Sequence, residues 1–175
     1  NQTSLYGASK ISCESFIQAF SNYGFFKSSI FRFVSWIGKG YSHGVIYDFV
    51  NKLLKEPTKL EILGDGNQVK SYLDVQDGIK GVLDISNLDK NNSSIFNLGH
   101  EETMNVKHLA DIVCEQMQLS NVEYLFKGGE RGWIGDSPMV HLYINKAKSL
   151  GWKPEISIEE GIRNTVKYLL KDQSR

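Results

Sequence analysis

The chain has 175 residues, the size of one domain or slightly more. Its 20 Lys and Arg balance its 20 Asp and Glu, so the formal charge of zero argues against generic binding to nucleic acid or to anionic membrane surfaces. Hydrophobic residues make up 41% of the sequence, enough to build a packed core and to exclude an intrinsically disordered chain.

The first half of the chain alternates helical and strand patterns. Apolar residues recur at intervals of three and four over residues 5–23, which predicts a helix carrying Cys13, Phe16, Ile17 and Phe20 on one stripe. The aromatic and β-branched run 27–34 predicts a buried strand. A glycine-punctuated loop then leads to a predicted helix at 45–54, and short strands are predicted at 60–63 and 71–75.

The second half continues the same alternation. The patterns predict a helix at 77–86, a strand at 94–98, a helix to residue 117 capped by Asn105, and a strand at 122–126. Helices at 145–150 and 158–170 close the chain, the last opened by a capping box of Ser157 and Glu160. Strands that alternate with helices indicate an α/β fold with parallel pairing.

Tyr6 and Lys10 form the most informative spacing in the chain. Residues four apart on a helix share a face, so the Lys10 ammonium would favour the phenolate form of Tyr6. A phenolate is what a tyrosine needs to act as a general base near neutral pH. The alternative is a solvated lysine beside a half-buried tyrosine, because a lone YxxxK pattern is common.

A second candidate is Gly38-x-Gly40-x-x-x-Gly44, which follows a strand and precedes a helix. Such a loop resembles a dinucleotide-binding turn, in which helix N-terminal amides receive a pyrophosphate. The spacing of the glycines is one residue longer than in the GxGxxG motif of such turns, and Tyr41 and His43 place bulk where phosphate would approach. We therefore favour a plain connecting loop.

A third candidate is the glycine-rich segment 128–136, whose Arg131 is suited to binding a phosphate or to pairing with a carboxylate.

The four histidines show no HxH or HExxH spacing, so we expect no metal site. Cys13 and Cys114 are too few for a disulfide framework, and both are predicted to be buried thiols in a reducing compartment. With no bilayer-length apolar run, we expect no membrane partner and a cytoplasmic protein.

Taken in order, these segments resemble the extended short-chain dehydrogenase/reductases that act on nucleotide sugars, the family of epimerases such as UDP-galactose 4-epimerase and of sugar-nucleotide dehydratases. Residues 6–10 resemble its YxxxK motif, and 30–38 resemble its R-x-x-N-x-x-G strand end. Residues 60–66 with 69–77 resemble its most specific block, L-x-I-x-G-D-G followed by R-D-Y-x-x-V-x-D. Residues 97–99 and 149–154 match its N-x-G and L-G-W-x-P segments.

The resemblance implies roles at the catalytic end. Tyr6 would be the base that removes a sugar hydroxyl proton, Lys10 would hold the nicotinamide ribose of NAD, and Phe33 would line the nicotinamide. The family's glycine-rich NAD-binding turn precedes the YxxxK motif, and the few residues before Tyr6 leave no room for it. We therefore expect the chain to be the C-terminal half of such a protein and to be inactive alone, with the NAD cradle in a missing N-terminal half.

The resemblance also implies substrate contacts. Ser35 stands where the family has Asn on the sugar diphosphate, Lys70 stands where it has Arg, and Arg131 lies near a second diphosphate arginine. The backbone at Val45 and from Glu61 to Leu63 would meet the nucleotide base. The partner would be a nucleotide sugar, with a UDP-hexose the best guess, and the full-length parent would be a homodimer.

The implied fold is the C-terminal part of a Rossmann-type doubly wound sheet plus a small α/β nucleotide-sugar domain. Residues 1–38 would belong to the Rossmann part and 39–175 to the substrate domain, with about 71–100 returning to the Rossmann sheet. The expected reaction is NAD-dependent epimerisation at C4 of the sugar through a transient keto-sugar. A 4,6-dehydratase, a keto-sugar reductase that uses NADPH, a non-catalytic nucleotide-sugar-binding module and a bare structural domain remain alternatives.

Overall fold

The computed structural model describes residues 4–129, 137 and 139–172. All of the helices and strands predicted from sequence are present, with ends shifted by a few residues. The helices are α1 (Leu5–Asn22), α2 (Val45–Lys55), α3 (Val75–Leu88), α4 (Val106–Gln116), α5 (Asn145–Ser149) and α6 (Ile158–Asp172). The strands are β1 (Ser28–Phe33), β2 (Ser35–Ile37), β3 (Lys59–Ile62), β4 (Val69–Lys70), β5 (Tyr72–Asp74), β6 (Ser93–Leu98), β7 (Met104–Asn105), β8 (Glu123–Phe126) and β9 (Met139–Val140).

Side-chain caps fix where two of the predicted helices begin. The Asn105 side-chain oxygen accepts a 2.7 Å hydrogen bond from the backbone N–H of His108 at the start of α4. The Ser157 hydroxyl accepts one of 3.2 Å from the backbone N–H of Glu160 at the start of α6. Each bond satisfies a backbone donor that has no partner inside the helix, which confirms both predicted caps.

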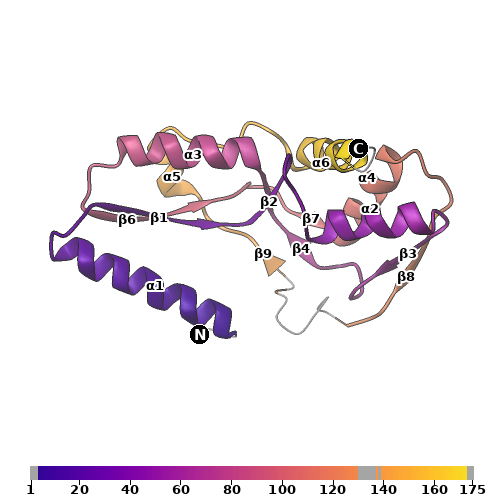
Figure 1. Ribbon diagram of the computed structural model, residues 1–175, viewed down its shortest axis with the longest axis horizontal. Helices are drawn as coiled ribbons and strands as arrows, with labels where there is room; N and C mark the ends of the chain where they lie inside the picture. Colours follow the sequence, from indigo (N-terminus) through magenta and orange to yellow (C-terminus); the bar gives the residue numbers. More distant parts are fainter. Residues whose placement is uncertain (1–3, 130–136, 138, 173–175) are drawn as a thin grey trace.

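Strands β1 and β6 pair in parallel and form the centre of one layered unit. In Figure 1 this pair lies between α1 on one side and α3 on the other, the arrangement of a doubly wound sheet. Phe31 and Phe96 occupy matching positions in the two strands, and their rings stack with centroids 5.8 Å apart. This unit confirms the predicted α/β fold with parallel pairing.

The other strands pair over long sequence distances. Strand β2 pairs in parallel with β5, and β3 pairs in parallel with β8. Strand β4 runs antiparallel to β7 and parallel to β9. The sequence did not predict the two-residue strands β4, β7 and β9 or the separation of β2 from β1. Such short pairings depend on partners far away in the chain.

Two apolar cores lie along the molecule. One surrounds the β1–β6 pair and includes Leu73, Ile85, Phe96, Leu98 and Trp152. The other brings together α2, α4 and α6, at the right of Figure 1, around residues such as Phe49, Leu109 and Ile162. The segment from β2 to the start of α2 runs between the two cores, and it carries part of the candidate site described below.

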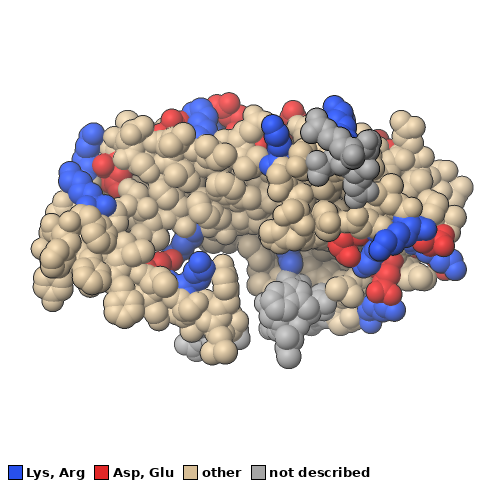
Figure 2. Space-filling model, in the orientation of Figure 1, with Lys and Arg blue, Asp and Glu red and all other residues tan. Residues whose placement is uncertain are grey.

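The prediction that Cys13 on α1 is buried was wrong. Cys13, Phe16 and Phe20 are exposed, Ile17 is half-buried, and Ser21 is the one buried residue of the helix. Helix α1 contacts β1 and β6, and this narrow pair of strands covers less of the helix than its apolar stripe requires. Figure 2 shows a largely uncharged surface over α1, at the lower left. Cys114, by contrast, is buried as predicted.

Among the residues that the structure describes, no helix has the length and apolar character needed to cross a bilayer.

Candidate functional site

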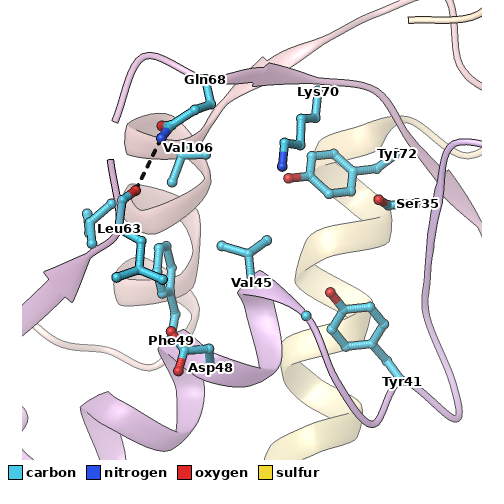
Figure 3. Close-up of a pocket in the computed structure, with 12 residues that line it drawn as sticks. Ser35, Tyr41, Val45, Asp48, Phe49, Leu63, Gln68, Lys70, Tyr72 and Val106 are labelled. Atoms are coloured by element: carbon cyan, nitrogen blue, oxygen red, sulfur yellow. Dashed lines mark hydrogen bonds between the residues drawn. The ribbon is translucent and has the colours of Figure 1, made fainter. Parts of the chain in front are cut away.

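A cavity of about 400 Å³ lies at the start of α2. Four residues predicted to contact substrate line it: Ser35 at the start of β2, Val45 at the start of α2, Leu63 just after β3, and Lys70 at the end of β4. These residues come from four separate segments, and the fold brings them together around one space (Figure 3).

Polar side-chain ends converge on one part of this cavity. Figure 3 shows the hydroxyl groups of Ser35, Tyr41 and Tyr72 and the ammonium group of Lys70 directed toward the space above Val45. Each of these groups can donate a hydrogen bond, and the ammonium carries a positive charge. This part of the cavity suits a ligand rich in oxygen atoms or negatively charged.

The opposite part of the cavity is apolar. Phe49, Leu63 and Val106 form this wall. Asp48 is the one carboxylate among the lining residues, and its Oδ2 lies 2.7 Å from the Lys52 ammonium, so its charge is balanced locally. An apolar wall facing a small cluster of polar groups is typical of a small-molecule site.

Gln68 is a lining residue that the sequence analysis missed. It is only 3% exposed, and its Nε2 donates a 3.2 Å hydrogen bond to the Leu63 carbonyl oxygen (Figure 3). Because a carbonyl only accepts, this bond fixes which way the amide points. Gly64 makes room for the amide, since a Cβ there would collide with it. A single glutamine carries no sequence signal of such a role.

Tyr41 was also missed as a site residue. Burial raises the pKa of its phenol, and the nearby backbone N–H of Ile46, in the first turn of α2, partly offsets that rise. Gly44 precedes that turn with φ of +104°, and a Cβ there would collide with the Tyr41 hydroxyl. Tyr41 therefore occupies the helix terminus that a dinucleotide cradle would need. The structure favours the plain-loop interpretation of residues 38–44.

A second cavity of about 370 Å³ adjoins the first. Ser35, Tyr41 and Gly44 line both cavities, and Trp36 and Val75 line only the second. The Tyr41 side chain thus forms part of the wall that the two cavities share.

Glu61 does not line either cavity. Its carboxylate lies 2.7 Å from the Lys127 ammonium, and the hydrogen bond from Lys127 lowers the pKa of Glu61. Its backbone carbonyl accepts a 3.1 Å hydrogen bond from Lys52. The side chain is therefore engaged at the surface, and the predicted contact of this segment with a base would involve Leu63, which lines the cavity.

Tyr6 and Lys10 lie together on the first turns of α1, as their spacing predicts. The Lys10 Nζ lies 5.5 Å from the centre of the Tyr6 ring. Tyr6 is 72% exposed, and neither residue lines the cavity. In Figure 1, α1 begins near the middle of the molecule and runs outward, so this pair lies at the inner end of the helix.

Phe33 ends β1 and is exposed. Its ring packs edge-on against Trp36, with centroids 4.7 Å apart, and stacks beside Phe31 at 6.3 Å. Ligands of doubly wound sheets bind beyond the carboxyl ends of parallel strands, which is where Phe33 stands. The structure places this aromatic face outside the 400 Å³ cavity.

Arg32 of the same strand connects β1 to α1. Its guanidinium forms two hydrogen bonds with the Glu14 carboxylate, at 2.8 and 2.5 Å, and this lowers the pKa of Glu14.

Arg131, predicted to contact the diphosphate, lies outside the described residues. Within the described ranges, no group of three or more His, Cys, Asp or Glu side chains could hold a metal ion.

Comparison with known proteins identifies relatives along almost the whole chain. A "Putative UDP-glucose 4-epimerase" of Methanocaldococcus jannaschii is 33% identical over 97% of this chain and 54% of its own length. The dTDP-D-glucose 4,6-dehydratase of Mus musculus is 30% identical over 97% of this chain and 48% of its own length. The chain therefore spans about half the length of the relatives it matches.

Solved structures show the same relationship. A crystal structure of UDP-galactose 4-epimerase superposes with a TM-score of 0.87 at 28% identity, over 98% of this chain and 55% of the other. The UDP-glucose 4-epimerase of Thermotoga maritima, solved with UDP-glucose, gives a TM-score of 0.83 at 28% identity, over 96% and 54%. The model of the NAD dependent epimerase/dehydratase family matches residues 1–99, more than half of the sequence. The chain belongs to the NAD dependent epimerase/dehydratase family.

Proposed function

We propose that the protein carrying this chain epimerises a UDP-hexose at C4, with NAD as cofactor, and that the 400 Å³ cavity holds the nucleotide sugar. One observation carries the proposal: residues from four separate segments, Ser35, Val45, Leu63 and Lys70, meet around one cavity with polar donors on one side and an apolar wall on the other.

The polar side of the cavity supports binding of the diphosphate. Lys70 supplies a positive charge to a phosphate oxygen, and the Ser35 hydroxyl donates a hydrogen bond beside it. Arg131 would add a second cation to the diphosphate.

The apolar side supports binding of the nucleotide base. Phe49, Leu63 and Val106 offer flat or aliphatic surface against which a pyrimidine ring can pack. Backbone groups next to Val45 and Leu63 would supply polar contacts at the edge of the ring. The bound UDP-glucose of the Thermotoga maritima relative supports the choice of a uridine nucleotide.

Tyr6 and Lys10 supply the proton chemistry in this proposal. The Tyr6 phenolate oxygen would remove the proton of the C4 hydroxyl and later return it to the C4 oxygen. The Lys10 ammonium, 5.5 Å from the Tyr6 ring centre, would hold the nicotinamide ribose. Because both side chains are on the exposed flank of α1, a cofactor and a sugar could reach them.

The described residues fit the nicotinamide end of NAD. Phe33 presents an exposed ring at the carboxyl end of β1, where a nicotinamide could pack against it. When bound, NAD supplies the reversible two-electron oxidation of the sugar carbon. In this proposal residues 1–38 and about 71–100 belong to the NAD-binding unit, and the rest of 39–175 to the substrate unit. The protein would act as a homodimer.

A 4,6-dehydratase is the second candidate, because the mouse dTDP-D-glucose 4,6-dehydratase is 30% identical. The two reactions leave different products. Incubating the intact protein with UDP-galactose and NAD, and analysing the nucleotides by anion-exchange chromatography and proton NMR, distinguishes them. We expect UDP-glucose without net reduction of NAD. Formation of a 4-keto-6-deoxy sugar nucleotide would support the dehydratase, and an unchanged substrate would contradict both.

A further inference from the structure

Tyr41 is placed to contact any ligand that enters the candidate site. Together with Ser35 and Gly44, it lines both the 400 Å³ cavity and the adjoining 370 Å³ cavity. Figure 3 shows its hydroxyl pointing toward the space that Ser35 and Lys70 also face. The phenol therefore lies among the polar groups of the cavity and not on its apolar wall.

The hydrogen bonding of Tyr41 determines what it can offer a ligand. The backbone N–H of Ile46 lies on one side of the phenol oxygen. A phenol can accept from one side and donate to another, so its hydrogen is available on the side that faces the cavity. The hydroxyl is left as a donor for an acceptor atom in the cavity.

The surroundings keep this donor protonated and in place. Burial raises the pKa of Tyr41 to about 12, so the phenol is neutral at physiological pH. The ring lies parallel to that of His43, with centroids 6.3 Å apart, and Gly44 leaves space for the hydroxyl. A neutral donor that lines the same cavity as a lysine ammonium is suited to an anionic oxygen.

We propose that Tyr41 is a binding residue of this site, whose hydroxyl donates a hydrogen bond to a phosphate oxygen of a nucleoside diphosphate. This inference rests on the proposed nucleotide-sugar function. It adds a ligand contact from the loop of residues 38–44, for which the sequence predicted only a connection between two elements. Tyr41 would then discriminate a nucleoside diphosphate from the bare nucleoside.

The test is the Tyr41→Phe variant of the intact protein, which keeps the ring and removes only the hydroxyl. Calorimetric titrations with UDP-glucose, UDP and uridine compare it with the wild type and with Tyr47→Phe. Tyr47 lies in α2, shortly after Tyr41 in the sequence, and is outside the lining of the cavity, so it is a matched control. Circular dichroism and the melting temperature check that both variants are folded.

We expect Tyr41→Phe to bind UDP-glucose and UDP about tenfold more weakly, since a hydrogen bond to a charged group is lost, and to bind uridine as the wild type does. Unchanged affinity for UDP, or an equal loss for uridine, would overturn the proposal. A loss for UDP-glucose alone would also overturn it, because the hydroxyl would then contact the sugar. If the wild type binds none of the three, the nucleotide-sugar function itself fails, which is a distinguishable result.

Discussion

The indole Nε1 of Trp152 donates a 3.1 Å hydrogen bond to the backbone carbonyl oxygen of Asp77. The Asp77 carboxylate in turn accepts hydrogen bonds of 2.9 Å from the backbone N–H groups of Glu155 and Ile156. These contacts join the start of α3 to the segment between α5 and α6, which lies far away in the sequence. They connect two of the blocks by which the chain resembles its family, and they are largely buried.

Replacing Asp77 should destabilise the fold. Asp77→Ala leaves two backbone N–H groups without their acceptor, and each such loss costs about 1–3 kcal/mol. We expect a loss of about 2–4 kcal/mol in the free energy of unfolding, measured by urea denaturation.

Asp77→Asn, which keeps an acceptor oxygen, should lose less of the free energy of unfolding. Asp84→Ala removes a carboxylate on the same helix that pairs with Lys80 at the surface, so it serves as the control. Equal effects of Asp77→Ala and Asp84→Ala would contradict this assignment.

The ion pair between Glu14 and Arg32 should make stability depend on pH. The pair lowers the pKa of Glu14 below its ordinary value of 4.5, so the ionised carboxylate stabilises the folded state above that pH. This contribution is lost as the pH falls through the lowered pKa. We expect Glu14→Gln to reduce the stability at pH 7 by at most about 1 kcal/mol, because Arg32 is half-exposed. In thermal melts, the difference from the wild type should shrink below pH 4.5. A difference that stays constant from pH 7 to pH 3 would show that the pair does not act in this way.

The two cysteines should react at different rates. Cys13 is exposed on α1, whereas burial raises the pKa of the Cys114 thiol, which also accepts a hydrogen bond from the Tyr124 hydroxyl. With iodoacetamide at pH 8, followed by peptide mass spectrometry, we expect Cys13 to be modified much faster than Cys114. Cys13→Ser should remove the fast phase and leave the slow one. Similar rates at both positions would contradict the placement of Cys114.

Tyr6 is the residue on which the proposed chemistry depends. Tyr6→Phe removes the phenol oxygen but keeps the ring beside Lys10, so turnover of UDP-galactose should fall by orders of magnitude. Because Tyr6 does not line the cavity, the affinity for UDP-glucose should stay within a few-fold of the wild type. Tyr23→Phe, at the other end of α1 and 82% exposed, is the matched control. Turnover retained by Tyr6→Phe would remove Tyr6 from the reaction.

Local sequence signals predicted the elements well. The caps at Asn105 and Ser157 depend on residues three positions away, and the structure confirms both. The burial of Cys13 was predicted wrongly, because an apolar stripe shows which face of α1 is hydrophobic but not how much sheet covers it. The contact of Trp152 with Asp77 depends on packing between distant segments, which periodicity does not encode.

The residues of the candidate site likewise fall into those that the sequence predicted and those that it missed. Ser35 and Lys70 came from the resemblance to a family, and the structure shows that they line one cavity. Tyr41 and Gln68 were missed, because their positions depend on Gly44 and Leu63 in three dimensions. No spacing rule marks a tyrosine whose hydroxyl meets the first turn of a helix.

The most direct test of the central claim, that the cavity at the start of α2 binds a nucleotide sugar, is a calorimetric titration of UDP-glucose into the intact protein and its Lys70→Ala variant. Lys59→Ala, which removes an exposed lysine outside the cavity, is the control. We predict that the wild type and Lys59→Ala bind equally and that Lys70→Ala binds more weakly by about 1–3 kcal/mol, the range for a lost charge-assisted hydrogen bond. Equal binding by all three proteins would contradict the placement of the diphosphate beside Lys70.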